Sequence, residues 1–137
     1  MRFAGYAAVF DVADRGGDVV RAGAFRASLA QTGDPRGAKV PLLWQHRGDV
    51  MVGRIEYLAE DARGLRVIGR LAETEAGAES ARALRAGRID GLSFGYRVRE
   101  ARAGEVGTRE LVALDLVEVS LVSVPMQRLA RVHRVEG

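Results

Sequence analysis

Hydrophobic and polar residues alternate along several short stretches of the chain, a pattern typical of strands with one buried face. Between residues 92 and 99, for example, an apolar or aromatic residue stands at every second position. The same pattern predicts strands at residues 2–10, 40–46, 51–58, 65–71, 92–99 and 110–124, with 19–20 as a short addition. The chain is therefore predicted to be rich in strands.

Two segments favour helices instead. Residues 22–31 are predicted to form a short helix that stops at residues 32–35, and residues 74–86 a second one, with Thr74 as its N-cap and Gly87 after its end. Because strands and helices do not alternate along the chain, a doubly wound parallel sheet is disfavoured. We expect one α+β domain over residues 1–137, a small, largely antiparallel sheet or β-barrel flanked by short helices.

The numbers of Cys and His residues exclude several kinds of functional site. The chain has 137 residues, two His and no Cys. The absence of Cys excludes a disulfide scaffold, a thiolate metal site and a Cys nucleophile, and two His are too few to build a zinc site unaided. We therefore expect neither a metal nor another cofactor.

The positive net charge is weak evidence for a nucleic-acid partner. The formal net charge is +3, and 20 of the 21 basic residues are Arg, dispersed along the chain among carboxylates. This dispersion favours a solvated surface with ion pairs over phosphate binding, so we expect no specific nucleic-acid partner. No targeting segment or membrane-length apolar run is evident, and we expect a soluble, intracellular protein without a membrane partner.

The most distinctive local string is Gly-Leu-Ser-Phe-Gly at residues 91–95. It matches the nucleophile elbow of α/β-hydrolases, but that motif needs a strand-to-helix turn at the serine, whereas here the alternation continues beyond Ser93. Flanking glycines on a strand leave the Ser93 hydroxyl uncrowded, which makes it a candidate nucleophile. A purely structural serine is the alternative.

A serine nucleophile needs a base, and the chain has two histidines to offer. His46 ends a predicted strand, where its neutral imidazole could take a proton from a hydroxyl. The alternative is an imidazole packed on Trp44 or paired with Asp49. His133 lies near the end of the sequence as a frayed or surface residue, so His46 is the preferred base.

A base histidine needs an orienting group, and the apolar run at residues 114–122 contains two carboxylates, Asp115 and Glu118. A carboxylate in such a run is costly unless it is paired. Glu118 could therefore orient the base, or form a salt bridge with one of the many arginines.

The register of the last two predicted strands helps to choose between the two carboxylates. If Arg99 pairs with Glu110, Ser93 lies opposite Leu116 and Glu118 is a diagonal neighbour on the same face, at roughly 7–8 Å. An imidazole fits in that space. A slip of one residue would instead turn the other carboxylate toward the serine.

Short strings in a fixed order carry a family resemblance over residues 3–132. They are GYAAVF at 5–10, GDVV at 17–20 with GAF at 23–25, LWQH at 43–46, GRI at 53–55, GLRV at 64–67, GLSFGY at 91–96 and LVEVSLVSVP at 116–125. Together they resemble the prohead (procapsid maturation) serine proteases of tailed phages and phage-like gene transfer agents, which are related to the herpesvirus assemblins.

The resemblance implies a fold and a set of site residues. The implied fold is herpesvirus-protease-like, a small β-barrel flanked by helices. His46 and Ser93 occupy the catalytic His and Ser positions of the family, and Glu118 falls where the herpesvirus relatives carry a second His. Those relatives use an Arg-bearing loop for the oxyanion, which makes Arg128 or Arg131 the candidates here.

The resemblance also implies a function: a serine endopeptidase that cleaves major capsid and scaffolding polypeptides during procapsid maturation, through an acyl-enzyme on Ser93 with His46 as general base. The implied location is the bacterial cytoplasm, inside the assembling procapsid. Self-association is a further expectation, because herpesvirus relatives are activated by dimerisation. The alternatives are a non-catalytic capsid-assembly or scaffold-binding module with the same fold, and a basic nucleic-acid-binding barrel.

Overall fold

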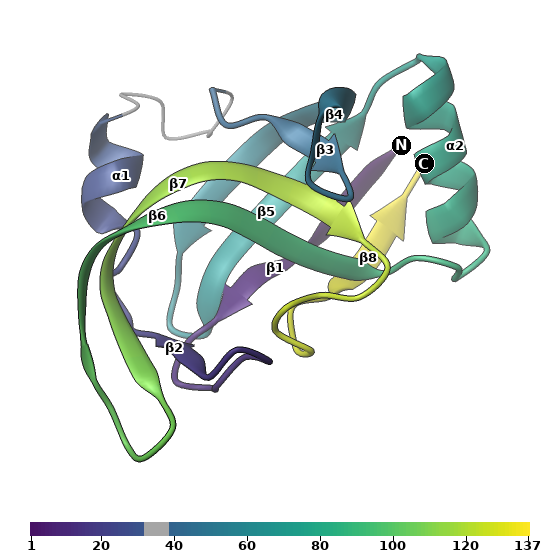
Figure 1. The fold of residues 1–137 in the computed structure, drawn as a ribbon. Helices are drawn as coiled ribbons and strands as arrows, with labels where there is room; N and C mark the ends of the chain where they lie inside the picture. Colours follow the sequence, from purple (N-terminus) through teal and green to yellow (C-terminus); the bar gives the residue numbers. More distant parts are fainter. Residues whose placement is uncertain (32–38) are drawn as a thin grey trace.

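The structure is a computed structural model that describes residues 1–31 and 39–137. Within these ranges the chain forms eight strands and two short helices (Figure 1). They are β1 (Arg2–Val9), β2 (Asp18–Val20), α1 (Arg26–Gln31), β3 (Leu42–Trp44), β4 (Arg47–Glu60), β5 (Gly64–Leu71), α2 (Glu75–Arg85), β6 (Gly91–Ala103), β7 (Arg109–Val122) and β8 (Val132–Glu136). The predicted helix stop at residues 32–35 lies outside the described residues.

The strands form one sheet in the order β2-β7-β3-β4-β5-β1-β8, and β6 pairs with β7. Five of the strand pairs are antiparallel, while β2 and β3 run parallel to β7. The prediction of a strand-rich, largely antiparallel α+β architecture is therefore confirmed.

The expected barrel closure is not confirmed. In the described part of the chain, β6 meets the segment before β8 at an isolated bridge between Gly91 and Arg131, where the Leu92 N–H donates to the Ala130 carbonyl at 2.9 Å. Beyond this point β6 pairs with β7 alone, and the two strands form a long curved hairpin whose β7 strand is also paired with β3 and β2 (Figure 1). Because β6 meets the segment before β8 only at that isolated bridge, no continuous ladder of the described strands seals the sheet.

The core lies on the inner face of the sheet. Strand β5 shows why these residues form a strand: Leu65 and Val67 are buried on one side, while Arg66 and Arg70 point outward. The largest fully buried side chains come from nearly every strand and include Phe3, Phe25, Leu42, Ile55, Leu92, Leu111 and Leu121.

The second helix follows its prediction closely. Helix α2 spans Glu75–Arg85, and the Thr74 hydroxyl accepts a hydrogen bond from the Gly77 N–H at 3.1 Å, as an N-cap should. Gly87 follows the helix with φ +70°, a conformation that favours glycine.

The first helix is shorter than predicted and begins at Arg26. Gly23 has φ +92°, which no helix accommodates, so residues 22–25 form turns. The Glu60 carboxylate then accepts the Gly23 and Phe25 N–H groups at 2.7 and 2.8 Å. These contacts hold the start of α1 against the end of β4.

Several strands differ from their predicted extents. Strand β6 runs on to Ala103 rather than ending at residue 99, and β4 spans Arg47–Glu60. Strand β8 was not predicted at all, because its residues alternate for too short a stretch to stand out. It pairs with β1, so the two ends of the described chain lie side by side (Figure 1).

Candidate active site

His46 lies in the two-residue turn that joins β3 to β4. Trp44 pairs with Arg47, and the two residues between them, Gln45 and His46, have φ of +51° and +61°. Positive φ at both central positions is typical of a type I′ hairpin turn, which usually contains Asn or Gly. A Gln-His pair in this conformation is strained, and such strain persists where surrounding contacts fix it.

Backbone and side-chain bonds to β7 provide those contacts. The Gln45 N–H donates to the Leu121 carbonyl at 2.9 Å, and the His46 N–H donates to the Ser120 hydroxyl at 3.1 Å. The Gln45 side chain also accepts the Ser123 N–H at 3.0 Å and donates to the Ser123 hydroxyl. The turn is therefore fastened to β7 on both sides of His46.

Glu118 on β7 contacts the imidazole directly. Both carboxylate oxygens lie 2.9 Å from His46 Nδ1, and the Ser120 hydroxyl donates to Oε1 at 2.9 Å. Glu118 is buried, and these bonds satisfy a carboxylate that would otherwise be costly there. Because a carboxylate accepts, Nδ1 carries the proton of the neutral ring, and Nε2 is left as the proton acceptor.

Ser93 lies on the same face of the β6–β7 ladder. It pairs directly with Ser120, and Gly95, two residues further along β6, pairs with Glu118. A Cβ on Gly95 would lie 3.0 Å from the Glu118 carboxyl group, so the Gly95 side of β6 is the side that Glu118 occupies. Since side chains alternate along a strand, Ser93 points to this side too.

The Ser93 hydroxyl makes no side-chain hydrogen bond within residues 1–31 and 39–137, and the Ser93 residue is buried. The His46 side chain, by contrast, is 45% exposed. The hydroxyl, the imidazole and the carboxylate thus come from three neighbouring elements, which are strand β6, the β3–β4 turn and strand β7. Such an arrangement can perform nucleophilic chemistry with base assistance.

Within residues 1–31 and 39–137, the two other carboxylates considered as partners of His46 have partners of their own. Asp49 pairs with Arg47 at 3.8 Å, and Asp115 pairs with Arg99 at 3.3 Å, so neither carboxylate approaches the imidazole. Among the described residues, Glu118 has no arginine partner.

The predicted register of β6 against β7 is wrong, although Glu118 and Ser93 still lie on the same face of the ladder. Glu110 pairs with Arg102 rather than Arg99, and Ser93 pairs with Ser120 rather than with residue 116. The ladder is shifted by four residues at the serine. An even shift leaves every side chain on the same face, so Glu118 is still a diagonal neighbour of Ser93.

A family model described as caudovirus prohead serine protease matches residues 1–136 of the chain. The chain belongs to this family. The prohead protease of Enterobacteria phage HK97 is 37% identical over 98 residues, which is 70% of this chain and 42% of that protein. The capsid polyprotein of Pseudomonas phage PAJU2 is 27% identical over 117 residues, 76% of this chain and 17% of that protein. The chain therefore spans less than half the length of these curated relatives.

Solved protease structures share the fold. The bacteriophage T4 capsid assembly protease matches with a TM-score of 0.69 at 16% identity, over 88% of this chain and 80% of that one. The Kaposi's sarcoma herpesvirus (KSHV) protease matches with a TM-score of 0.64 at 14% identity, over 99% and 65%. At these identities the likeness concerns the fold alone. The fold of this member of the prohead protease family is therefore similar to that of the herpesvirus proteases.

The other histidine of this family member lies in a different setting. His133 is exposed on β8, where Arg66 Nη1 donates to its Nε2 at 2.8 Å and the Tyr6 ring lies 6.0 Å away. Burial of the ring, together with Arg66 and Arg63, holds the pKa of His133 below its ordinary value. Its described partners do not include Ser93.

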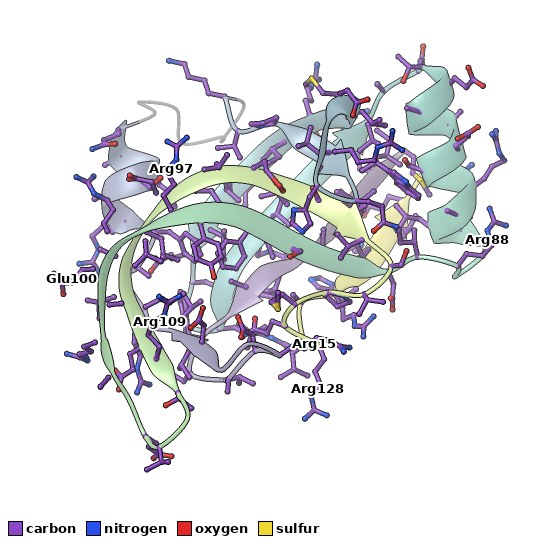
Figure 2. All side chains as sticks on the ribbon, viewed as in Figure 1. Arg15, Arg88, Arg97, Glu100, Arg109 and Arg128 are labelled. Atoms are coloured by element: carbon purple, nitrogen blue, oxygen red, sulfur yellow. The ribbon has the colours of Figure 1, made fainter. Side chains whose placement is uncertain are left out.

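The two arginines expected to serve an oxyanion lie on the loop that follows β7. This loop runs beside the start of β6 through the bond between Leu92 and Ala130. Arg131 is held by Asp90 at 2.7 Å and by the Arg128 carbonyl at 2.8 Å. Arg128 extends into solvent in Figure 2, and its side chain has no hydrogen-bond or ion-pair partner in the described ranges.

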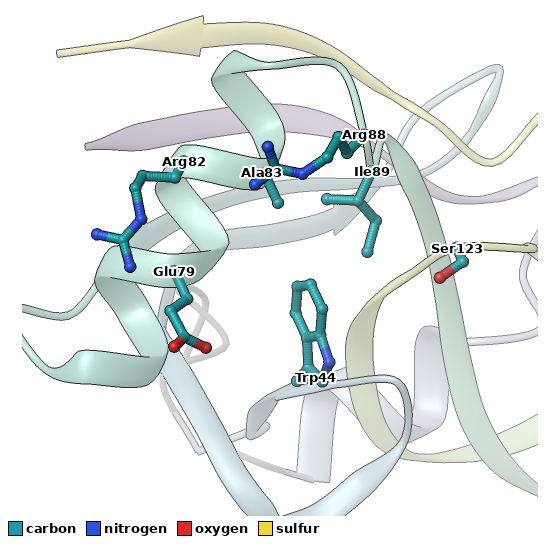
Figure 3. A pocket seen from close by; sticks show the side chains of 7 residues that line it. All are labelled: Trp44, Glu79, Arg82, Ala83, Arg88, Ile89 and Ser123. Carbon is teal, nitrogen blue, oxygen red and sulfur yellow. The ribbon is translucent and has the colours of Figure 1, made fainter.

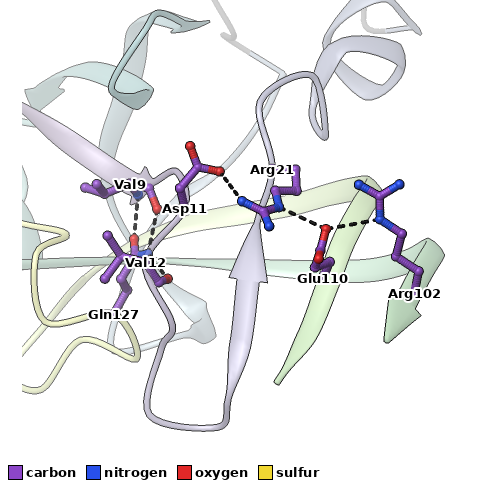
Figure 4. A network of polar contacts seen from close by, with 7 residues as sticks. All are labelled: Val9, Asp11, Val12, Arg21, Arg102, Glu110 and Gln127. Carbon is purple, nitrogen blue, oxygen red and sulfur yellow. Dashed lines mark hydrogen bonds and ion pairs between the residues drawn. The ribbon is translucent and has the colours of Figure 1, made fainter. Parts of the chain in front are cut away.

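Gln127 is a buried residue that sequence reasoning missed. Its amide accepts the Val9 N–H and donates to the carbonyls of Val9 at 2.6 Å and Val12 at 3.1 Å (Figure 4). It thereby anchors the loop after β7 to the end of β1. No pattern in the neighbouring sequence distinguishes this glutamine, because its partners lie more than 100 residues away on the chain.

A cavity of about 420 Å³ lies beside the His46 turn, between β3 and α2 (Figure 3). The indole of Trp44 faces Ala83 and Ile89 across it, and Ser123, the partner of Gln45, lies on its wall. The cavity thus adjoins the strands that carry the candidate site.

Within the described residues, no group of three or more His, Cys, Asp or Glu is placed to hold a metal ion. A search of the same residues finds no helix with the length and apolar character that crossing a bilayer requires.

Proposed function

We propose that this chain is a serine endopeptidase that cleaves capsid and scaffolding polypeptides during procapsid maturation, inside the assembling shell. The observation that carries the proposal is the contact between His46 Nδ1 and the buried Glu118 carboxylate, on the face of the β6–β7 ladder that holds Ser93. Membership of the prohead serine protease family supports the substrate class.

The proposed reaction uses these three side chains in turn. His46 Nε2 takes the proton of the Ser93 hydroxyl as its oxygen attacks the scissile carbonyl, and the same nitrogen then protonates the leaving amine. Water hydrolyses the acyl-enzyme by the reverse proton path. Glu118 keeps the imidazole in the required tautomer and stabilises the imidazolium while it is charged. We assign formation of the Ser93–His46 hydrogen bond to the substrate complex, in which such bonds tighten.

The loop after β7 is the proposed source of oxyanion stabilisation. It runs beside Leu92, the neighbour of Ser93, and it carries Arg128 and Arg131. Since Asp90 engages Arg131, Arg128 is the arginine that is available to move toward a developing negative charge.

Two further features support a polypeptide substrate. Past Leu92, the edge of β6 that faces away from β7 has no partner strand among the described residues, so an extended chain can pair there with its main-chain groups. The cavity beside Trp44 offers space for one of its side chains.

The test is co-expression of the protein with its cognate capsid protein, followed by intact-mass measurement of the capsid protein. We expect the wild type to shorten the capsid protein, and Ser93→Ala and His46→Ala to leave it whole. His133→Ala is the matched control and should process normally. Equal processing by wild type and Ser93→Ala would show that the site is wrong. Binding without cleavage by every form, wild type included, would favour a non-catalytic assembly module.

A further inference from the structure

The outer face of strands β4, β5, β1 and β8 gathers arginines that are far apart in the sequence. Arg70 pairs in register with Arg54 on one side and with Arg2 on the other, which places three like charges in a row across three strands. Like charges directly opposite one another destabilise a sheet. All three lie beside one carboxylate, Glu56, at 2.8, 3.1 and 3.7 Å. The row therefore keeps an excess of positive charge.

A small cavity lies next to this row. Its volume is about 150 Å³, and Ala4 and Ile68 give it apolar walls. Three arginines and one carboxylate complete the lining, namely Arg2, Arg66, Arg134 and Glu136, so positive charge is in excess. This size suits a single acidic side chain. The apolar stem of such a side chain would contact Ala4 and Ile68, while its carboxylate met the guanidinium groups.

Arg66 differs from the other two arginines in that no close ion pair is found for it among the described residues. Arg2 already pairs with Glu56 and Arg134 with Glu136 at 2.7 Å, but Arg66 donates to the neutral ring nitrogen of His133. Among the described residues no carboxylate oxygen forms a close ion pair with Arg66, and the Asp61 carboxylate interacts with it only at longer range. The lowered pKa of His133, to which Arg66, Arg63 and Arg134 all contribute, is consistent with a positive potential here.

We propose that this cavity, hereafter the basic pocket, binds a glutamate or aspartate side chain of an acidic polypeptide segment. The basic pocket is built from β1, β5 and β8 and shares no residue with the Ser93 site. It would hold an acidic partner chain independently of peptide-bond cleavage.

Features of the face favour a polypeptide over nucleic acid. The carboxylates Glu56, Glu136 and Asp61 are interspersed among the arginines, which breaks the continuous positive track that a phosphate backbone follows. The nearby Tyr6 ring is also covered by Arg63 and Arg66, at 5.1 and 5.7 Å from its centroid, so it is not free to stack on a base.

The test measures binding of a fluorescent polyglutamate peptide to the purified protein by anisotropy. We expect salt-sensitive binding that the double variant Arg66→Ala/Arg134→Ala weakens about tenfold, which corresponds to about 1.4 kcal/mol, because arginine–carboxylate contacts at an exposed site are individually weak. Arg102→Ala/Arg109→Ala is the control: it removes the same charge from the β6–β7 hairpin, where both arginines are exposed and paired, and should change affinity by less than about twofold. Glu136→Gln should tighten binding, because it releases Arg134.

Two results would overturn the proposal. Equal weakening by the double variant and its control would mean that overall charge, not the basic pocket, attracts the peptide. Tighter binding of a DNA duplex that displaces the peptide would assign the face to nucleic acid. If the double variant fails to fold, the single change Glu136→Gln still decides, because a non-specific surface predicts only a slight gain. Ser93→Ala should bind as the wild type does, which separates this test from the proposed peptidase function.

Discussion

Glu118 and Glu110 lie on the same strand, β7, and both side chains are largely shielded, with exposed fractions of 9% and 15%. Their partners differ. Glu118 faces the His46 imidazole, whereas Glu110 accepts from Arg21 and Arg102, both at 3.0 Å (Figure 4). An arginine stays charged at any working pH, so Glu110 is fixed as half of an ion pair. An imidazole exchanges its proton, which makes the Glu118 pair capable of chemistry.

Each of these two carboxylates also has a glycine close to it. Gly95 on β6 lies over the Glu118 carboxyl group, and Gly104, in the turn directly after β6, lies beside the side chain of Glu110, where a Cβ would be 3.2 Å from Glu110 Cγ. A carboxylate next to a glycine thus occurs twice along the hairpin, once at the candidate site and once near its turn. The two cases differ in the partners of the carboxylate.

Replacing each glutamate by glutamine should give the largest difference in activity between the Glu118 and Glu110 variants. Glu118→Gln keeps the shape but favours the wrong tautomer of His46, so we expect kcat/KM to fall by about 10³–10⁴. Glu110→Gln should leave kcat/KM unchanged. Both values come from cleavage of the capsid protein with the variant folded, as judged by circular dichroism. Equal losses in the two variants would refute the distinction.

Replacing Gly95 or Gly104 by alanine should have the next largest effect on stability and activity. The new Cβ of Gly95→Ala would meet the Glu118 carboxyl group at 3.0 Å and push it from His46. We expect a loss of ~1–3 kcal/mol in unfolding free energy and a fall in kcat/KM of roughly 10–100-fold. Gly104→Ala meets the Thr108 hydroxyl at 2.6 Å and should destabilise the hairpin without slowing cleavage. Denaturant unfolding and cleavage assays on both variants provide the comparison.

Ser120 should matter less, because it acts through its neighbours. Its hydroxyl accepts the His46 N–H and donates to Glu118, so Ser120→Ala leaves a buried carboxylate and the strained turn each short of one bond. We expect a loss of about 1–3 kcal/mol in stability and of roughly tenfold in kcat/KM, with little change in KM. A change confined to KM would instead indicate a role in substrate binding.

The smallest effect belongs to the Glu110 ion pairs. Hydrogen bonds from Arg21 and then from Arg102 hold the pKa of Glu110 below its usual 4.5. A carboxyl group with a depressed pKa stabilises the fold above its unfolded pKa, and the contribution disappears as pH falls through the folded value. Wild type should therefore melt slightly above Glu110→Gln at neutral pH, and the gap should close in acid. A gap that widens in acid would contradict this assignment.

The amino-acid pattern predicted much of the site and less of its geometry. The pairing of β6 with β7 follows from alternation, but their register does not, because β-bulges near Gly95 and Glu100 and a turn shorter than expected shift the ladder. Because the shift is even, Glu118 lies on the face of Ser93 as expected. An odd shift would have favoured Asp115 instead.

Two other features of the structure could not be predicted from the sequence around the residues that form them. Gln45 and His46 form a left-handed turn that their residue types do not favour, since its stability comes from Leu121, Ser120 and Ser123 on a distant strand. The gathering of arginines around the basic pocket was equally hidden. They are dispersed along the sequence, and the pairing of β1 with β5 and β8 brings Arg2, Arg66 and Arg134 together.

The separation of His46 from Glu118 along the chain, 72 residues, has a consequence for timing. At a synthesis rate of ~5–20 residues per second, roughly 4–14 s pass between the emergence of the imidazole and that of its carboxylate. The strand that carries Glu118 must then insert between β3 and β6, a non-local pairing that forms slowly. A nascent chain therefore lacks the contact between His46 and Glu118 until β7 is complete, so the proposed site cannot exist before that strand has been made.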